Sequence, residues 1–300
     1  MADLKLYKIH ADKVVELEGR SMAIEKSLQV LIEQNMEALL GVRFLASEYS
    51  TGKAHGGRID SLGIDEDGCP VIFEYKRALN ENVINQGLFY LDWLMDHKAE
   101  FTLLVLKKYG QKQADAVEWN SPRLLCIAGD FTKYDEHAVK QINRNIELFR
   151  YRQFGEDLLL LEFVNTSVEQ ETPAISESGK NANKTVSDYL EKADKKLCDR
   201  FESLRAFLLA MGDDVTIKVL KFYIAFRRIK NFACVEVHPS TGKLVIFVKI
   251  SPDTIKLEPG FTRDVRKIGH QATGDLEITI ASDEDIEKAK GLLIKSYEQN

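Results

Sequence analysis

Several classes of protein are excluded by what this sequence lacks. Its four cysteines, Cys69, Cys126, Cys198 and Cys234, are too far apart in sequence to form a zinc-ribbon pair. No apolar run approaches the roughly 18 residues of a membrane-spanning helix, and residues 101–106 have only the size of a core segment. The opening residues are charged and lack the apolar centre of a secretory signal. We therefore expect a reduced, cytoplasmic protein without membrane partners.

The chain also lacks an excess of positive charge. Its net charge at pH 7 is −6, so a nucleic-acid partner would have to meet a local basic patch rather than the overall field of the protein. The sequence patterns of α/β-hydrolases, HExxH zinc proteases and dinucleotide-binding proteins are absent as well. These absences weaken the case for three large enzyme classes.

A polar segment separates two parts of the chain. Residues 165–184, NTSVEQETPAISESGKNANK, contain almost no large apolar side chain, so they cannot contribute to a core and are typical of a linker. We predict a first domain at residues 1–164 and a second, accessory domain at residues 185–300. A chain of 300 residues has room for two domains of about 100–200 residues each.

The first part predicts an α/β domain with three layers and a mixed sheet. Residues 99–108 fit either a helix or a buried strand. The expected helices, from apolar spacing, span residues 21–40, 82–97 and 133–143. The expected strands span residues 4–9, 13–18, 42–49, 58–64, 71–76, 123–128, 146–152 and 157–164.

The second part predicts a smaller α+β domain. Residues 226–232 and 261–267 interleave basic and aromatic side chains, which is typical either of a nucleic-acid surface or of a basic strand edge with core phenylalanines. We favour the strand edge. The expected helices span residues 186–211 and 283–297, and the expected strands span residues 215–226, 233–237, 243–250 and 276–280.

The stretch RIDSLGIDEDGCPVIFEYKR, residues 58–77, predicts a β-hairpin with charges where a buried strand would be apolar. Alternation along the strands places Glu74 and Lys76 on one face and brings Asp60 next to them on the neighbouring strand. Charges in such a position are costly unless they are paired or bind a metal ion. The pattern therefore indicates a metal site or an ion pair.

The order of these residues resembles the PD-(D/E)xK nuclease superfamily, in its archaeal and bacterial mismatch- and flap-nuclease branch. The motifs that carry the resemblance are RID at 58–60, EYK at 74–76 and QGLFY at 86–90, whereas Ile59 stands where the superfamily often has proline. The resemblance implies a restriction-endonuclease-like core in residues 1–164. It also implies hydrolysis of phosphodiester bonds, with DNA as the expected substrate and Mg²⁺ or Mn²⁺ as the cofactor.

The same resemblance assigns roles to the charged residues of the hairpin. Asp60 and Glu74 would bind the metal ion, and the backbone carbonyl of Tyr75 would be a third ligand. Mg²⁺ is bound in this way in many enzymes, by one or two carboxylates completed by water and substrate phosphate. Lys76 would orient the attacking water or stabilise the developing negative charge.

Five further residues take supporting roles by resemblance. Glu25 on the first helix would reach the metal ion through a water molecule. Gln86 and Tyr90, one helical turn apart, would position the scissile phosphate or the lysine. Arg58 and Arg77 flank the site and would hold backbone phosphates.

Alternatives remain open from the sequence. The same fold could be a non-catalytic module that binds nucleic acid or a protein, and Glu74 with Lys76 could be a structural ion pair. Residues 185–300 resemble a small uncharacterised domain that accompanies nuclease-like domains in bacteria. This domain could bind nucleic acid, a partner protein or a second copy of the chain as a homodimer.

Overall fold

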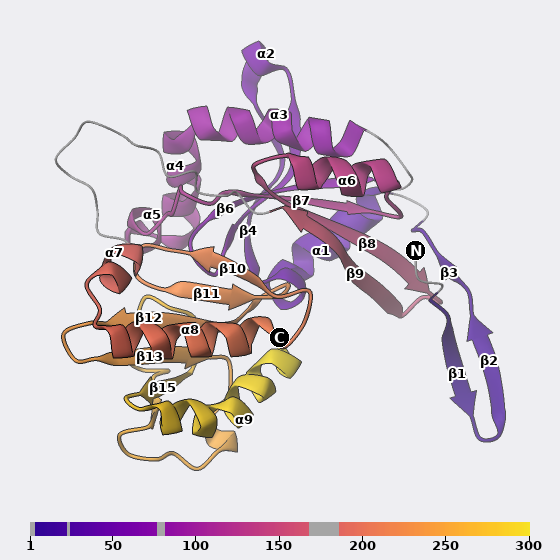
Figure 1. The fold of residues 1–300 in the computed structure, drawn as a ribbon. Coiled ribbons are helices and arrows are strands. Elements are labelled where there is room, and N and C mark those ends of the chain that lie inside the picture. The colour runs from indigo at the N-terminus through magenta and orange to yellow at the C-terminus, as the bar shows by residue number, and fades with distance from the viewer. Residues whose placement is uncertain (1–3, 23–24, 77–81, 168–185) are drawn as a thin grey trace. The chain divides into compact units, whose positions relative to one another are not determined.

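The computed structural model describes residues 4–22, 25–76, 82–167 and 186–300. The chain divides into two compact units, residues 1–174 and 175–300 (Figure 1). One boundary differs from the prediction, because strand β9 continues to Ser167 and takes up the first three residues of the expected linker. The predicted phosphate-binding residue Arg77 lies outside the described residues.

A mixed sheet forms the centre of the first unit. In the part that the structure describes, its seven strands follow the order β3-β8-β7-β6-β5-β4, with β9 paired to β8. The β6–β7 and β7–β8 pairs are parallel and the other pairs are antiparallel. The expected mixed α/β class is therefore confirmed. The strands are β3 Gly19–Arg20, β4 Val42–Ser50, β5 Arg58–Asp65, β6 Pro70–Lys76, β7 Arg123–Ala128, β8 Asn145–Phe154 and β9 Leu158–Ser167; β1 Leu6–His10 and β2 Lys13–Leu17 form a separate antiparallel hairpin.

Helices cover both faces of this sheet (Figure 1). Apolar residues of α3 and α4 join Ile72 and Cys126 in one core, whereas α1 packs on the opposite face, where Ser61 of β5 donates to Glu33. The ambiguous segment 99–108 is helical. No helix in the described ranges is long and apolar enough to cross a membrane. The helices are α1 Glu25–Leu40, α2 Gly52–His55, α3 Asn82–Asp96, α4 Lys98–Tyr109, α5 Gln111–Asp115 and α6 Lys133–Gln141.

A buried ionic group connects three strands of the sheet. Arg123 on β7 donates from Nε and Nη2 to the carboxylate of Glu147 on β8, at 2.7 and 2.8 Å, and from Nη1 to Asp65 on β5, at 3.1 Å. The other oxygen of Asp65 accepts from the amides of Asp67 and Cys69 and so closes the β5–β6 turn. This group ties the hairpin that carries the candidate site to the middle of the sheet.

The second unit is an α+β domain, as expected. Within its described residues an antiparallel sheet has the order β10-β11-β12-β13-β15-β14, and the helices share one core with it. Phe226 and Phe232 are buried in that core, as expected for core phenylalanines, but they lie on the inner strands β11 and β12 and not on an edge strand. The elements are α7 Val186–Glu191, α8 Lys195–Leu209, β10 Thr216–Val219, β11 Ile224–Arg227, β12 Asn231–His238, β13 Lys243–Val248, the 3-10 turn Pro252–Thr254, β14 Thr262–Asp264, β15 Leu276–Ile280 and α9 Asp283–Gln299.

Two predictions for the second unit are wrong. The expected helix over residues 186–211 is broken, because Asp194 caps the start of α8 by accepting from the amide of Leu197 at 2.7 Å. The expected strand over residues 215–226 is two strands, β10 and β11, joined by a turn in which the amide of Leu220 donates to the carbonyl of Tyr223.

Candidate active site

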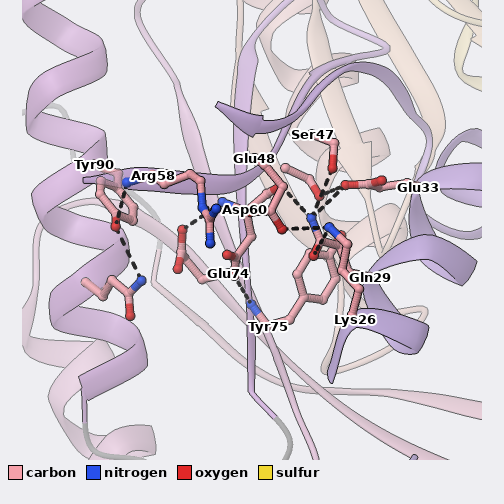
Figure 2. A network of polar contacts seen from close by, with 12 residues as sticks. Lys26, Gln29, Glu33, Ser47, Glu48, Arg58, Asp60, Glu74, Tyr75 and Tyr90 are labelled. Carbon is pink, nitrogen blue, oxygen red and sulfur yellow. Dashed lines mark hydrogen bonds and ion pairs between the residues drawn. The ribbon is translucent and has the colours of Figure 1, made fainter. Parts of the chain in front are cut away.

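The candidate site begins where the pairing of β5 with β6 ends. The register of the two strands stops at the Ser61–Phe73 pair. Beyond that pair a side chain replaces the main chain as the hydrogen-bond acceptor. Oδ2 of Asp60 accepts from the amide of Tyr75 at 3.0 Å. The amide of Asp60 in turn approaches Oε1 of Glu74 at 3.5 Å (Figure 2). Side-chain oxygens thus fill the opening between the strands, and the two acidic residues lie next to each other.

Glu74 is a buried carboxyl group with one oxygen left unsatisfied. Its exposed fraction is 0%, and Oε2 has no hydrogen-bond partner among the described residues. Burial, followed by the neighbouring charge of Asp60, raises the pKa of Glu74 to about 9. A buried carboxylate with an unsatisfied oxygen is strongly disfavoured. The group is therefore held protonated at neutral pH unless a cation comes to it.

The donor set at this position fits a divalent metal ion. The described residues contain no group of three or more His, Cys, Asp or Glu side chains arranged around one metal position. Mg²⁺, however, commonly uses only one or two carboxylates, with water and substrate phosphate as its other ligands. Asp60 and the unsatisfied oxygen of Glu74 are suited to that role. In the structure the amide of Tyr75 donates to Asp60. The role of the Tyr75 carbonyl as a metal ligand stays a prediction.

The charge of Lys76 acts on both carboxyl groups, Asp60 and Glu74. Burial raises the pKa of Asp60, while the Tyr75 amide and the charge of Lys76 oppose that shift. The charge of Lys76 likewise opposes the larger upward shift in the pKa of Glu74. Nζ of Lys76 lies 3.9 Å from Oε1 of Glu25, the first residue of α1. The structure therefore brings Asp60, Glu74, Lys76 and Glu25 together.

Helix α3 supplies a second set of the predicted residues. Nε2 of Gln86 lies 3.4 Å from Oη of Tyr90, and Oη accepts from the amide of Arg58 at 3.2 Å. Tyr90 is buried, whereas the side chain of Arg58 is 67% exposed and pairs with Glu48. Gln86 and Tyr90 therefore hold the start of β5, two residues before Asp60.

A polar network that no sequence pattern marked lies on the α1 side of Asp60 (Figure 2). Nε2 of Gln29, on α1, donates to the main-chain carbonyl of Asp60 at 2.7 Å and lies within hydrogen-bond distance of Glu33 and Ser47, at 2.9 and 3.2 Å. Ser61 donates to the same glutamate at 2.6 Å. Because Gln29 is buried, these bonds fix the backbone of Asp60 from the α1 face of the sheet.

Replacing Gln29 with methionine is expected to leave the carbonyl of Asp60 unsatisfied. An unsatisfied buried acceptor costs about 1–3 kcal/mol, so the free energy of unfolding should fall by that amount. The nucleic-acid cleavage that the family resemblance implies should fall with it, because the carboxylate of Asp60 is no longer held in place. Denaturant unfolding and a cleavage assay measure the two effects. Gln34→Met, at an exposed position on the same helix, is the control and should change neither.

Glu48 is a further acidic residue that no sequence pattern marked. Its backbone has φ of +52°, a conformation that costs of order 1–3 kcal/mol for such a residue. Oε1 contacts Nζ of Lys26 at 2.6 Å and Oε2 contacts Nε of Arg58 at 2.7 Å. The hydrogen bond from Lys26 is the main reason that the pKa of Glu48 is lowered. Glu48 therefore remains charged and holds the exposed arginine near the site.

Comparison with known families gives a match to the second unit. Residues 186–300 match a family described as a domain of unknown function, DUF5655, which confirms that the second unit resembles an uncharacterised domain. An uncharacterised protein of Haemophilus influenzae is 26% identical over 305 residues, which cover 97% of this chain and 98% of that protein. The similarity to this relative therefore extends over both parts of the chain.

Solved structures with partial similarity include a repair endonuclease and EndoMS. A repair endonuclease from Pyrococcus abyssi is 23% identical with a TM-score of 0.29, over 46% of this chain and 50% of that one. A complex of EndoMS with dsDNA is 16% identical with a TM-score of 0.26, over 49% of this chain and 64% of that one. The chain therefore spans less than two thirds of either protein.

Proposed function

We propose that this protein is a divalent-metal-dependent nuclease that hydrolyses phosphodiester bonds of nucleic acid, with DNA as the substrate class. The observation that carries the proposal is the buried Glu74 carboxyl, which has an unsatisfied oxygen next to Asp60 and within the influence of Lys76. A purely structural ion pair would satisfy its buried oxygens. In a site that binds a cation together with its substrate, one carboxylate oxygen is expected to lack a protein partner, because the cation is its partner.

The residues divide the chemical work between them. A bound Mg²⁺ or Mn²⁺ supplies a Lewis acid for a phosphoryl oxygen and lowers the pKa of a coordinated water. Asp60 and Glu74 would hold that ion on the sheet. Lys76, positioned by Glu25, would stabilise negative charge that develops on the phosphate. Arg58 would exchange its contact with Glu48 for a backbone phosphate of the substrate.

Wild-type protein should cleave labelled DNA with Mg²⁺ or Mn²⁺ and not with EDTA. The substrates to compare are single-stranded, duplex, flap and mismatched DNA, with single-stranded RNA beside them. Asp60→Asn keeps the shape of the side chain but weakens the ligand, so it should slow cleavage by more than the 10–100-fold that changes around metal ligands typically cause.

The matched control is Asp96→Asn, at an exposed position near the end of α3, which should cut like wild type. Equal cleavage by Asp60→Asn and wild type would reject the site. Metal-independent binding without any cleavage would instead support a non-catalytic nucleic-acid-binding module on the same fold.

A further inference from the structure

An exposed aromatic stack lies at the edge of the candidate site. The rings of His55, in α2, and Phe89, in α3, are stacked with centroids 3.8 Å apart and planes inclined by 18°. Nε2 of His55 is 3.2 Å from the carbonyl oxygen of Phe89. Phe89 nevertheless remains 48% exposed. A phenylalanine ring so exposed contributes little to the core, so its position calls for another explanation.

The loop that presents His55 is held in a defined shape. Gly52 and Gly56 have φ of +82° and +69°, which glycine adopts without strain. The amide of Thr51 donates to the carbonyl of Gly57 at 3.0 Å, and the amide of Gly57 donates to Oγ1 of Thr51 at 2.9 Å. The histidine therefore sits on a small closed loop rather than on a free end.

The loop and the helix meet at Tyr90. A side chain at Gly57 would lie 2.5 Å from the ring of Tyr90, so only glycine permits this close approach. The ring of Phe89 lies 5.8 Å from the same tyrosine. Oη of Tyr90 accepts from the amide of Arg58. Tyr90 therefore contacts both the aromatic stack and the arginine that we propose to bind phosphate. Lys53, also in α2, is exposed and adds positive charge to this loop.

We propose that Phe89, supported by His55, stacks on one unpaired nucleobase next to the phosphodiester bond that is cut. This inference rests on the proposed nuclease function and adds a substrate-binding residue to it. Every base has a flat π-face that can stack on an aromatic ring, and positive charge nearby holds the backbone. A base inside a duplex is already covered on both faces, so only a single-stranded or extruded nucleotide can make this contact.

The test measures binding apart from cleavage. The full-length protein is titrated in EDTA with a labelled single-stranded DNA and with a blunt duplex of the same length, and affinity is followed by fluorescence anisotropy. Phe89→Ala should weaken single-strand binding by about tenfold and leave duplex binding unchanged. Phe89→Trp should restore it. Leu103→Ala, which removes a 47% exposed apolar side chain from α4, is the control and should bind like wild type.

Photocrosslinking gives a positional readout. A single-stranded DNA that carries 5-iodouracil should crosslink to the peptide containing Phe89 or to that containing His55, and Phe89→Ala should lose the crosslink. Equal binding of single strands by Phe89→Ala and wild type, equal weakening of both DNA forms, or no binding of single strands by wild type overturns the inference.

The outcomes separate this inference from the proposed function. Metal-dependent cleavage of single-stranded DNA by Phe89→Ala at the wild-type rate would reject the base contact and keep the nuclease. Selective loss of single-strand binding, in a protein that cuts no substrate, would keep the base contact and reject the nuclease.

Discussion

Glu74→Gln is expected to abolish metal-dependent cleavage and at the same time to stabilise the metal-free protein at alkaline pH. The substitution keeps the size of the side chain but removes the charge that would hold the metal ion. Cleavage should fall more than about 100-fold, since even residues around metal ligands contribute about 10–100-fold. Gain of stability with loss of activity is expected where a site keeps a costly group for function.

The pH dependence follows from the raised pKa of Glu74. Its ordinary value is 4.5, and in the folded protein without metal it is about 9. Between these values the folded state keeps a proton that the unfolded state has lost. The contribution of Glu74 to the free energy of unfolding is therefore fully present below pH 4.5. It is lost as pH rises towards 9, at roughly 1 kcal/mol per pH unit. Glutamine has no proton to lose, so the variant should not show this decline.

Thermal unfolding from pH 5 to pH 9 measures the difference. The two tryptophans, Trp93 and Trp119, both lie in the first unit, so their fluorescence follows the unit that carries the site. Wild type should lose stability relative to Glu74→Gln as pH rises, and millimolar Mn²⁺ should stabilise wild type alone. Parallel pH profiles, or equal stabilisation of both proteins by Mn²⁺, would show that Glu74 neither holds a proton nor binds the ion.

Residue spacing could predict the geometry at the centre of the candidate site, whereas the roles of its residues came from the family resemblance. Side chains alternate along a strand, which correctly placed Glu74 and Lys76 on one face and Asp60 beside them. The spacing of four on α3 predicted that Gln86 and Tyr90 share one face of the helix, and in the structure their side chains are in contact. Such relations lie within one element or one hairpin, where the geometry is nearly constant.

The residues around that centre could not be predicted, because tertiary packing places them. Gln29 reaches the carbonyl of Asp60 from 31 positions away, which depends on how α1 crosses the sheet. The left-handed backbone of Glu48 has no local sequence signal. The turn at Leu220–Tyr223, LKFY, likewise lacks glycine, proline, asparagine or aspartate, and so it was interpreted as part of a continuous strand.

The largest loss of stability is expected from Arg123→Met. The side chain of Arg123 is 3% exposed, and those of its partners Asp65 and Glu147 are 3% and 8% exposed. Removing the cation leaves two carboxylates buried without it, and breaking a buried pair in this way costs about 3–5 kcal/mol. Denaturant unfolding followed by tryptophan fluorescence should show this loss for the first unit.

Arg150→Met is the matched control for the burial of the charge. The side chain of Arg150 is only 7% exposed, whereas those of its partners Asp130 and Glu162 are 26% and 38% exposed. Those carboxylates can be hydrated once the arginine is gone, so its loss should cost clearly less than the loss of Arg123. Equal effects of the two substitutions would show that burial of the acidic partners does not set the cost.

A triple variant separates the value of the ion pairs from the penalty of breaking them. Arg123→Met combined with Glu147→Met and Asp65→Asn removes all three charges and keeps an oxygen at position 65 for the amides of the turn. The loss of stability in Arg123→Met can come from buried carboxylates that no longer face the arginine, and the triple variant should then recover most of that stability. The loss in the single variant should also become smaller as pH falls, because those carboxylates become protonated. A triple variant as unstable as Arg123→Met would instead mean that the arginine itself holds β5, β7 and β8 in place. In either case the hairpin carrying Asp60 and Glu74 is anchored through Asp65, so cleavage activity measured on the same variants reports how far this anchor positions the candidate site.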